Sequence, residues 1–117
     1  MIHELKILPE YFEPVIKGEK TFEIRVNDRD FKRGDYLALN EYWDGKYTGR
    51  SCMVYVDYIL DDSFLLPVGM VAMSIKPCAL IRTRDQNAEM IAAPPYWFTV
   101  PVIENTEVDN EICREER

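Results

Sequence analysis

Apolar and polar residues alternate along several short stretches of the chain, which is the pattern of strands that bury one face. In the stretch 21–26, apolar residues hold the even positions and polar residues the odd ones, namely Phe22, Ile24 and Val26 against Thr21, Glu23 and Arg25. We interpret this stretch as a half-buried strand. Comparable patterns predict four more strands, at residues 2–8, 36–43, 51–60 and 70–76.

One short helix is predicted between the first two strands. Its apolar residues recur at helical spacing, and Pro9 suits the first helical turn. Gly18 stands where a left-handed residue commonly ends a helix. Pro14 lacks an amide hydrogen and crowds the preceding turn, so the helix is limited to one or two turns.

Five predicted strands and one helix within residues 1–76 indicate a mainly β (α+β) domain, and a small barrel rather than repeated βαβ units. Residues 77–117 differ in composition, since they contain four of the seven prolines. We expect them to form a C-terminal extension that packs in part on the barrel and frays over residues 104–117. The apolar residues available for that packing are Tyr96, Trp97, Phe98, Val100, Val102 and Ile103.

Charge and composition exclude several functional classes. The chain has 14 Lys and Arg against 21 Asp and Glu, a net charge of −7, which opposes binding along a nucleic-acid backbone. Three cysteines and a single histidine, His3, supply neither a disulfide framework nor a zinc site, so no bound metal is predicted. No cofactor fingerprint and no membrane-length apolar run occur, and we expect a cytoplasmic protein with reduced thiols.

The helix exit carries the residues with the clearest chemical potential. It reads Gly18-Glu19-Lys20-Thr21-Phe22-Glu23-Ile24-Arg25, a glycine turn that leads into a strand. Strand alternation places Glu23 and Arg25 on one face, and Lys20 can turn toward the same side. Such a group can bond a base edge through the carboxylate and an anion through the cations. The alternative is an ordinary exposed ion pair, which contributes about 0–1 kcal/mol.

The same octet matches the motif GxKxxExR and resembles the ASCH domains of the PUA-like superfamily, small β-barrels linked to RNA. The match extends through 27–31, Gly34-Asp35 and Tyr47-Thr48-Gly49-Arg50, and there the chain resembles the DUF3850 branch, which is common in phages and mobile elements. The resemblance covers residues 2–76. It implies a PUA-like mixed β-barrel of about five or six strands, with a cleft between helix and barrel that holds RNA or a nucleotide.

The resemblance also implies roles for individual residues. Gly18 would form the turn, Lys20 and Arg25 would supply cations, and Glu23 would read a base edge or transfer a proton. Further residues would extend the rim of the cleft or stack on a base, namely Arg29, Tyr42, Trp43, Tyr47, Thr48 and Arg50.

Two other functions stay open at this stage. Some ASCH-like proteins hydrolyse N4-acetylcytidine without a metal, which would make Lys20, Thr21 and Glu23 catalytic here, although Glu23 stands where those enzymes have their nucleophilic Thr. The third reading is an interaction or ligand-sequestering protein that contacts a protein partner through its acidic surface or its tail. The sequence does not choose an oligomeric state.

Overall fold

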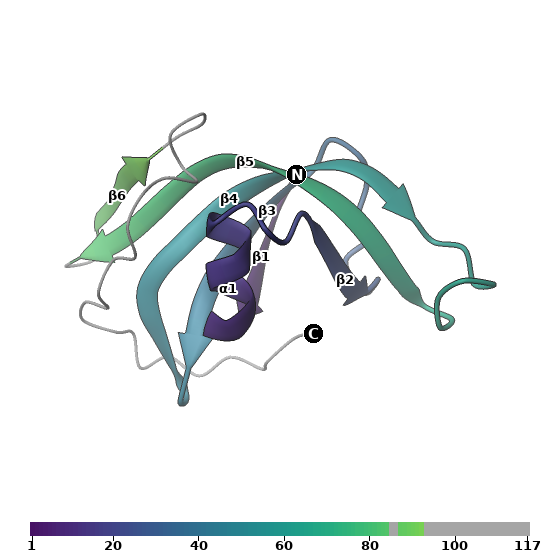
Figure 1. The fold of residues 1–117 in the computed structure, drawn as a ribbon, viewed down its shortest axis with the longest axis horizontal. Helices are drawn as coiled ribbons and strands as arrows, with labels where there is room; N and C mark the ends of the chain where they lie inside the picture. Colours follow the sequence, from purple (N-terminus) through teal and green to yellow (C-terminus); the bar gives the residue numbers. More distant parts are fainter. Residues whose placement is uncertain (85–86, 93–117) are drawn as a thin grey trace.

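The computed structural model describes residues 1–84 and 87–92, which form one helix and six strands (Figure 1). In chain order the elements are β1 (Ile2–Ile7), α1 (Pro9–Ile16), β2 (Phe22–Val26), β3 (Tyr36–Trp43), β4 (Lys46–Leu60), β5 (Met70–Arg84) and β6 (Asn87–Ala92). The expected packing of residues 96–103 and the expected fraying of 104–117 fall outside the described residues.

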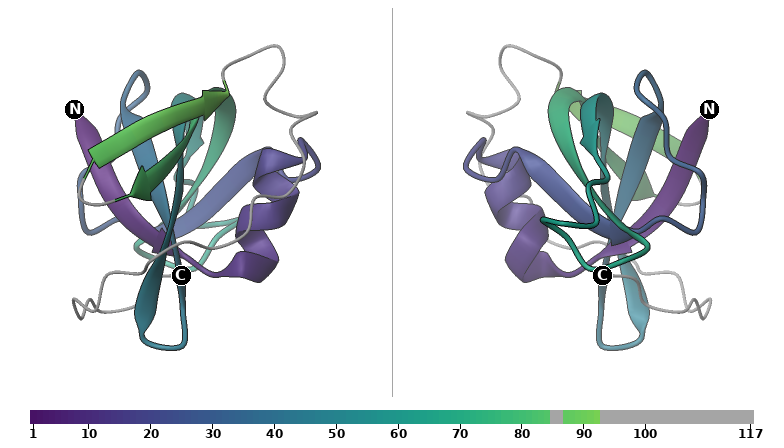
Figure 2. Two further views of the ribbon diagram at one scale, coloured as in Figure 1. Left: turned by 90° about the vertical axis from the view of Figure 1, so that its left-hand side faces the viewer. Right: turned by 90° about the vertical axis from the view of Figure 1, so that its right-hand side faces the viewer.

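A single mixed sheet holds the strands in the order β1-β3-β4-β5-β2. Strand β1 pairs parallel to β3, and the other pairs are antiparallel. Strand β6 pairs with residues 80–84 of β5. It lies on the same edge of β5 as β2, which pairs with residues 70–74. The long strands β4 and β5 bend strongly, so the sheet curls into a half-barrel (Figures 1 and 2). The prediction of a mainly β, barrel-like fold with one short helix is therefore confirmed at that level.

Helix α1 lies under the arch of β4 and β5 and closes the concave side of the sheet (Figure 1). Pro9 opens the helix and Gly18 follows its end with a φ of 78°, where a side chain would be strained. The Gly18 amide donates to the Val15 carbonyl at 3.1 Å. This end fixes the direction in which the chain enters β2. The helix buries three side chains in the core, Phe12, Val15 and Ile16.

The hydrophobic core fills the concave side of the sheet beneath the helix. Its members come from α1 and from β1, β3, β4 and β5, where inward residues alternate with outward ones. The fully buried members include Leu5, Leu37, Leu39, Val54, Val56, Met73 and Leu80. The buried side chains of Glu23 and Arg25 therefore lie against an apolar core.

Two strands are longer than the sequence pattern predicted. Strand β4 starts at Lys46 instead of residue 51, because Gly49, with a φ of 94°, lies in a bulge opposite Glu41 rather than in a turn. Strand β5 continues past residue 76 to Arg84, and Pro77 is accommodated next to a second bulge. The boundary expected after residue 76 therefore falls inside β5. Among the described residues, no helix has the length and apolar character needed to cross a membrane.

Candidate functional site at the seam between β1 and β2

Strand β2 buries its charged face and exposes its apolar face. Glu23 and Arg25 are each 3% exposed, whereas Phe22, Ile24 and Val26 are 48%, 41% and 54% exposed. The prediction that Glu23 and Arg25 share a face is confirmed. The alternative of an exposed ion pair is wrong, because both side chains point into the half-barrel. Burying two ionisable groups is costly unless each is paired and hydrogen-bonded.

The carboxylate of Glu23 holds both neighbouring cations. Arg25 Nε donates to Glu23 Oε1 at 3.0 Å, and Lys20 Nζ contacts Glu23 Oε2. Lys20 Nζ also donates to the Phe22 carbonyl at 2.7 Å. The three side chains therefore form one connected group with two basic members and one acidic member. The prediction that Lys20, Glu23 and Arg25 come together is therefore confirmed.

Arginine side chains bridge the gap between the two edge strands of the sheet. Arg25 Nη2 donates to the Lys6 carbonyl at 3.0 Å, and Arg29 Nη1 donates to the Glu4 carbonyl at 2.6 Å. Both carbonyls belong to β1 and face away from β3, where an edge strand would otherwise leave them unpaired. Strands β1 and β2 thus come together through side chains rather than through a backbone ladder. We call this gap the seam.

A pocket of about 260 Å³ opens at the seam. It is bounded by the end of β1, the first turn of α1 and the start of β2, and its lining residues are Ile7, Leu8, Tyr11, Lys20, Phe22, Glu23, Ile24 and Arg25. Arg25 Nη1 is buried and has no hydrogen-bond partner among the described residues. Burying a hydrogen-bond donor without a partner is unfavourable, because the donor gives up its hydrogen bonds to water. A ligand with a hydrogen-bond acceptor at this position would replace the missing bond.

The walls of the pocket combine aromatic rings with backbone groups of β2. Lys20 Nζ lies 5.9 Å from the Tyr11 ring centroid and 5.1 Å from that of Phe22, so the ammonium group stands near both rings. The Thr21 carbonyl accepts a hydrogen bond from the Ile75 amide in β5. Because bonding alternates along an antiparallel strand, the backbone groups of Ile24 point the other way, toward the seam. The pocket therefore offers flat apolar surfaces with hydrogen-bonding groups between them.

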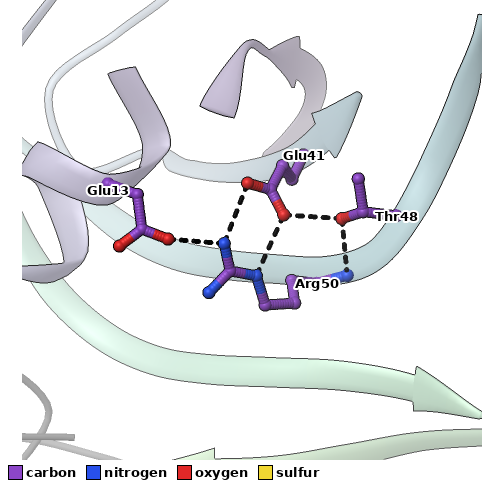
Figure 3. Close-up of polar contacts among 4 residues, drawn as sticks. All are labelled: Glu13, Glu41, Thr48 and Arg50. Atoms are coloured by element: carbon purple, nitrogen blue, oxygen red, sulfur yellow. Dashed lines mark hydrogen bonds and ion pairs between the residues drawn. The ribbon is translucent and has the colours of Figure 1, made fainter. Parts of the chain in front are cut away.

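A second buried polar cluster ties α1 to the β3–β4 hairpin (Figure 3). Arg50 Nε and Nη2 donate to the two carboxylate oxygens of Glu41, both at 2.9 Å, and Nη2 also donates to Glu13 at 2.6 Å. The Thr48 hydroxyl donates to Glu41 at 2.6 Å and accepts from the Arg50 amide at 3.3 Å. Burial alone would lower the pKa of Arg50, but the hydrogen bonds and charges of Glu41 and Glu13 outweigh it and raise that pKa.

The family comparison covers both clusters. The model of the family described as "Domain of unknown function (DUF3850)" matches residues 2–75. The chain belongs to the DUF3850 family. It is also similar to a protein of Escherichia phage P2 described as "Uncharacterized 12.9 kDa protein in GpA 3'region". The two are 40% identical over 60 residues, which is 51% of this chain and 55% of the phage protein, so the similarity spans about half of each.

The other residues that the motif suggested lie apart from the pocket in this DUF3850 protein. Thr48 and Arg50 are buried strand residues of the second cluster and not parts of a loop at the rim. Trp43 is 60% exposed at the end of β3, and Tyr47 packs edge-to-face against Tyr42 at 5.3 Å between ring centroids. Gly18 forms the expected turn and Arg29 reaches the seam. Thr21 is exposed and does not line the pocket.

Five pocket residues of the DUF3850 domain were missed by the sequence reading, namely Ile7, Leu8, Tyr11, Phe22 and Ile24. Ile7, Leu8 and Tyr11 come from the end of β1 and the first turn of α1, a short distance before the motif. Their pattern is that of ordinary core residues, and Tyr11 is 41% exposed. Tyr11 could have been predicted from its place in the first turn of α1, because Lys20 follows the end of the same helix.

Cys52 lies between the two polar clusters of the DUF3850 domain and is 1% exposed. Burial raises the pKa of its thiol well above the ordinary value, and the charges of Glu23 and Glu41 raise it further against the opposing charges of Lys20 and Arg50. Such a thiol is a poor nucleophile because the reactive form is the thiolate. Within the described residues, no group of three or more His, Cys, Asp and Glu side chains is placed to hold a metal ion.

Proposed function

We propose that this protein binds a single nucleotide, or one base of a short RNA, in the seam pocket, as an ASCH-type member of the PUA-like superfamily. The observation that carries the proposal is Arg25, a pocket-lining residue whose buried Nη1 has no hydrogen-bond partner among the described residues. Glu23 stands directly beside it. A donor and an acceptor side by side match the edge of a nucleobase, which presents both kinds of group.

The pocket walls suit a planar ligand. Tyr11 and Phe22 are 41% and 48% exposed and supply rings at the pocket surface. Stacking of a base on such a ring contributes on the order of 1–3 kcal/mol. Lys20 is within reach of both rings, and an ammonium group near the pocket favours a ligand that carries a phosphate or an electron-rich carbonyl. The protein's net charge of −7 disfavours contact with many phosphates.

The pocket volume supports a small ligand. Pockets for drug-sized molecules span about 300–1,000 Å³, and the seam pocket, at about 260 Å³, lies just below that range. One base with its sugar is therefore a better match than a nucleic-acid strand. Because few phosphates would be contacted, affinity should fall only slightly as the salt concentration rises.

Calorimetric titration of the full-length chain with the four ribonucleoside monophosphates, and with short RNAs, tests the proposal. We expect base-dependent binding that weakens about tenfold or more in Arg25→Lys, which keeps the charge but loses the planar fork. Tyr11→Leu should weaken binding through lost stacking and leaves the charged group in place. Arg33→Lys, at an exposed site away from the pocket, is the matched control. Equal affinity for all bases in wild type and variants would overturn the proposal.

A second candidate function rests on the contact between Lys20 and Glu23. In a metal-independent hydrolase of N4-acylated cytidine, Glu23 would take a proton from water as the oxygen attacks the acyl carbon. The Lys20 ammonium group would stabilise the oxyanion, and the proton would pass to N4 as the C–N bond breaks, releasing cytidine and a carboxylate. Water serves as nucleophile here because Thr21 is exposed and outside the pocket lining.

Incubation of the protein with N4-acetylcytidine, followed by chromatography, separates the two functions. Turnover that persists with a chelator and is lost in Glu23→Gln would establish the hydrolase. Binding of acylated cytidine without release of cytidine would leave ligand binding as the function and remove the hydrolase. Tyr11→Leu would lower both binding and turnover, so it checks that both belong to one pocket.

A further inference from the structure

The loop between β4 and β5, residues 61–69, holds the two most exposed large apolar side chains that the structure describes. Phe64 is 95% exposed and Val68 is 87% exposed, and Leu65 in the same loop is 70% exposed. The loop projects beyond the sheet from the ends of these two strands (Figure 1). We call Phe64, Leu65 and Val68 the loop apex. A group of exposed apolar residues that includes an aromatic ring is typical of a surface that contacts another molecule.

Hydrogen bonds define the shape of this loop. The Asp62 carboxylate accepts a hydrogen bond from the Phe64 amide at 2.8 Å, and the Asp62 carbonyl accepts one from the Leu65 amide at 3.0 Å. At the base of the loop, the Gly69 carbonyl accepts a hydrogen bond from the Asn27 amide at 2.8 Å. The apolar side chains are therefore presented on a preformed turn. A preformed turn loses less conformational entropy on binding than a segment that must first be ordered.

The loop apex takes no part in the core or in the seam pocket. None of its three side chains belongs to the hydrophobic core cluster, and none lines the seam pocket. The side chains at the loop apex therefore contribute little to the packing of the domain. They are also separate from the site where we propose that a nucleotide binds.

The charges of the loop indicate the chemistry of its partner. Asp61 and Asp62 stand just before Phe64 and are both exposed, and residues 61–69 contain no Lys or Arg. The phosphates of a nucleic acid or of an anionic lipid surface would repel these carboxylates. A second copy of the chain, which has a net charge of −7, would be repelled as well. The partner that complements this loop is a different protein with an apolar pocket and basic residues at the rim of that pocket.

We propose that the loop apex is a docking element, which inserts Phe64 and Leu65 into an apolar pocket of another protein. Lys or Arg side chains at the rim of that pocket pair with Asp61 and Asp62. Anchors buried in a desolvated pocket supply most of the binding free energy of such an interface, whereas charge pairs at the rim mainly speed association. The proposal is independent of any ligand in the seam pocket.

Photo-crosslinking followed by a binding measurement tests the proposal. The full chain, with a photoreactive benzoylphenylalanine in place of the exposed Ser63, is produced in the organism that encodes it. The same group in place of Lys46, which is exposed in the β3–β4 hairpin, is the control. We expect position 63 to give a protein adduct that position 46 does not give. The protein is identified by mass spectrometry, purified, and titrated against the unmodified chain by calorimetry.

Substitution of Phe64 should separate docking from folding. We expect Phe64→Ser to weaken binding of the purified partner about tenfold or more. The melting temperature should stay unchanged, because the Phe64 side chain is exposed and packs on nothing in the core. Trp43→Ser is the matched control, since it removes an exposed aromatic side chain from the end of β3. It should leave the affinity for the partner unchanged.

The charge of the loop is tested without disturbing its shape. The double variant Asp61→Asn and Asp62→Asn removes two carboxylates, but an amide oxygen at position 62 still accepts the hydrogen bond from Phe64. We expect this variant to bind the partner several-fold more weakly and with a smaller dependence on salt concentration. Tighter binding by this variant would overturn the proposal.

Three further results would also overturn it. One is an adduct pattern at position 63 that matches the pattern at position 46, and another is an affinity that Phe64→Ser leaves unchanged. The third is an adduct that contains only a second copy of the chain, which would assign the loop apex to self-association. Sedimentation with phosphatidylglycerol vesicles provides a last comparison. Vesicle binding that is lost in Phe64→Ser would assign the loop apex to a membrane surface instead of a protein.

Discussion

Arg25 of β2 and Lys6 of β1 are joined by a hydrogen bond of 3.0 Å from the guanidinium Nη2 to the backbone carbonyl. The same guanidinium bonds Glu23 through Nε. One side chain thus links the charged group of the pocket to the opposite wall of the seam. Binding and stability are coupled at this residue, because its fork both shapes the pocket and connects the sheet edges.

Replacing Arg25 should strongly destabilise the fold. In Arg25→Met, the buried Glu23 keeps only Lys20 as a partner and the Lys6 carbonyl loses its donor. Breaking a buried ion pair by removing one partner costs about 3–5 kcal/mol. Urea denaturation at neutral pH measures this loss as a lower midpoint. Lys32→Met is the control, since the Lys32–Asp30 pair is exposed and should contribute about 0–1 kcal/mol. Similar losses in both variants would contradict the bridging role.

The hydroxyl of Thr48 should matter more than its methyl group. Thr48→Val keeps the shape but removes the bond to Glu41 and the acceptor for the Arg50 amide. Leaving such buried groups unsatisfied costs about 1–3 kcal/mol. Thr48→Ser keeps the hydroxyl and should recover most of the loss in thermal unfolding. If serine were no better than valine, the hydrogen bonds would not be the source of the effect.

Glu13 should anchor α1 to the sheet. It is the helix residue that bonds Arg50, at 2.6 Å. In Glu13→Gln the charge-assisted bond weakens, so the amides of α1 should exchange with solvent faster while those of the β3–β4 hairpin stay protected. Hydrogen exchange by NMR resolves the two regions. Glu10→Gln, an exposed change on the same helix, should alter neither rate, and faster exchange across the whole sheet would point to general destabilisation instead.

Asp35 should make stability depend on acid pH. Burial alone would raise its pKa, but hydrogen bonds from His3 and the Lys32 amide, with the charges of His3 and the amino terminus, hold the pKa below its ordinary value. The unfolded chain therefore binds this proton more readily than the folded chain. The contribution of Asp35 is fully present above its unfolded pKa and is lost as the pH falls through the folded value.

Urea titrations of wild type and Asp35→Asn between neutral pH and pH 3 measure this dependence. Their difference in unfolding free energy should be constant down to about pH 5 and shrink below about pH 4. Asp61→Asn, at an exposed position, should track the wild type throughout. A difference that grows as the pH falls would have the wrong sign.

Cys52 should resist thiol reagents until the protein unfolds. Burial raises its pKa well above the ordinary value and blocks access, while Cys78 is only partly buried. At mildly alkaline pH, mass spectrometry after alkylation should find Cys78 labelled and Cys52 unmodified. Labelling of Cys52 should rise in step with urea-induced unfolding. Rapid labelling of Cys52 in the native protein would show that the interior between the two clusters is open to reagents.

The sequence predicted which residues of β2 share a face, but not which face is buried. Alternation is symmetric and does not report which face is buried, although apolar side chains usually face the interior. The reverse holds because Glu23 satisfies Arg25 and Lys20, and because Arg25 also finds a carbonyl in β1. Such compensation depends on a partner distant in the chain, so no local pattern reports it. The GxKxxExR motif was the informative signal.

The second cluster was harder to predict for a different reason. Glycine is typical of turns, but Gly49, which has a positive φ, lies in a bulge inside β4. That bulge carries Thr48 and Arg50 inward to Glu41. The turn between β3 and β4 lies at Asp44 and Gly45, which both have positive φ, as is typical of this residue pair in a hairpin. A glycine in a strand and a glycine in a loop look alike until the pairing is known.

The arginine bridges at the seam also set a distance. Strands joined by a backbone ladder approach to about 4.8 Å, which leaves no room for a guest molecule. Here guanidinium groups span the gap, so arginine side chains set its width and not the spacing of a backbone ladder. The width of this opening therefore depends on two side chains, Arg25 and Arg29, and Arg29 is the one whose replacement leaves the buried pair of Arg25 and Glu23 intact.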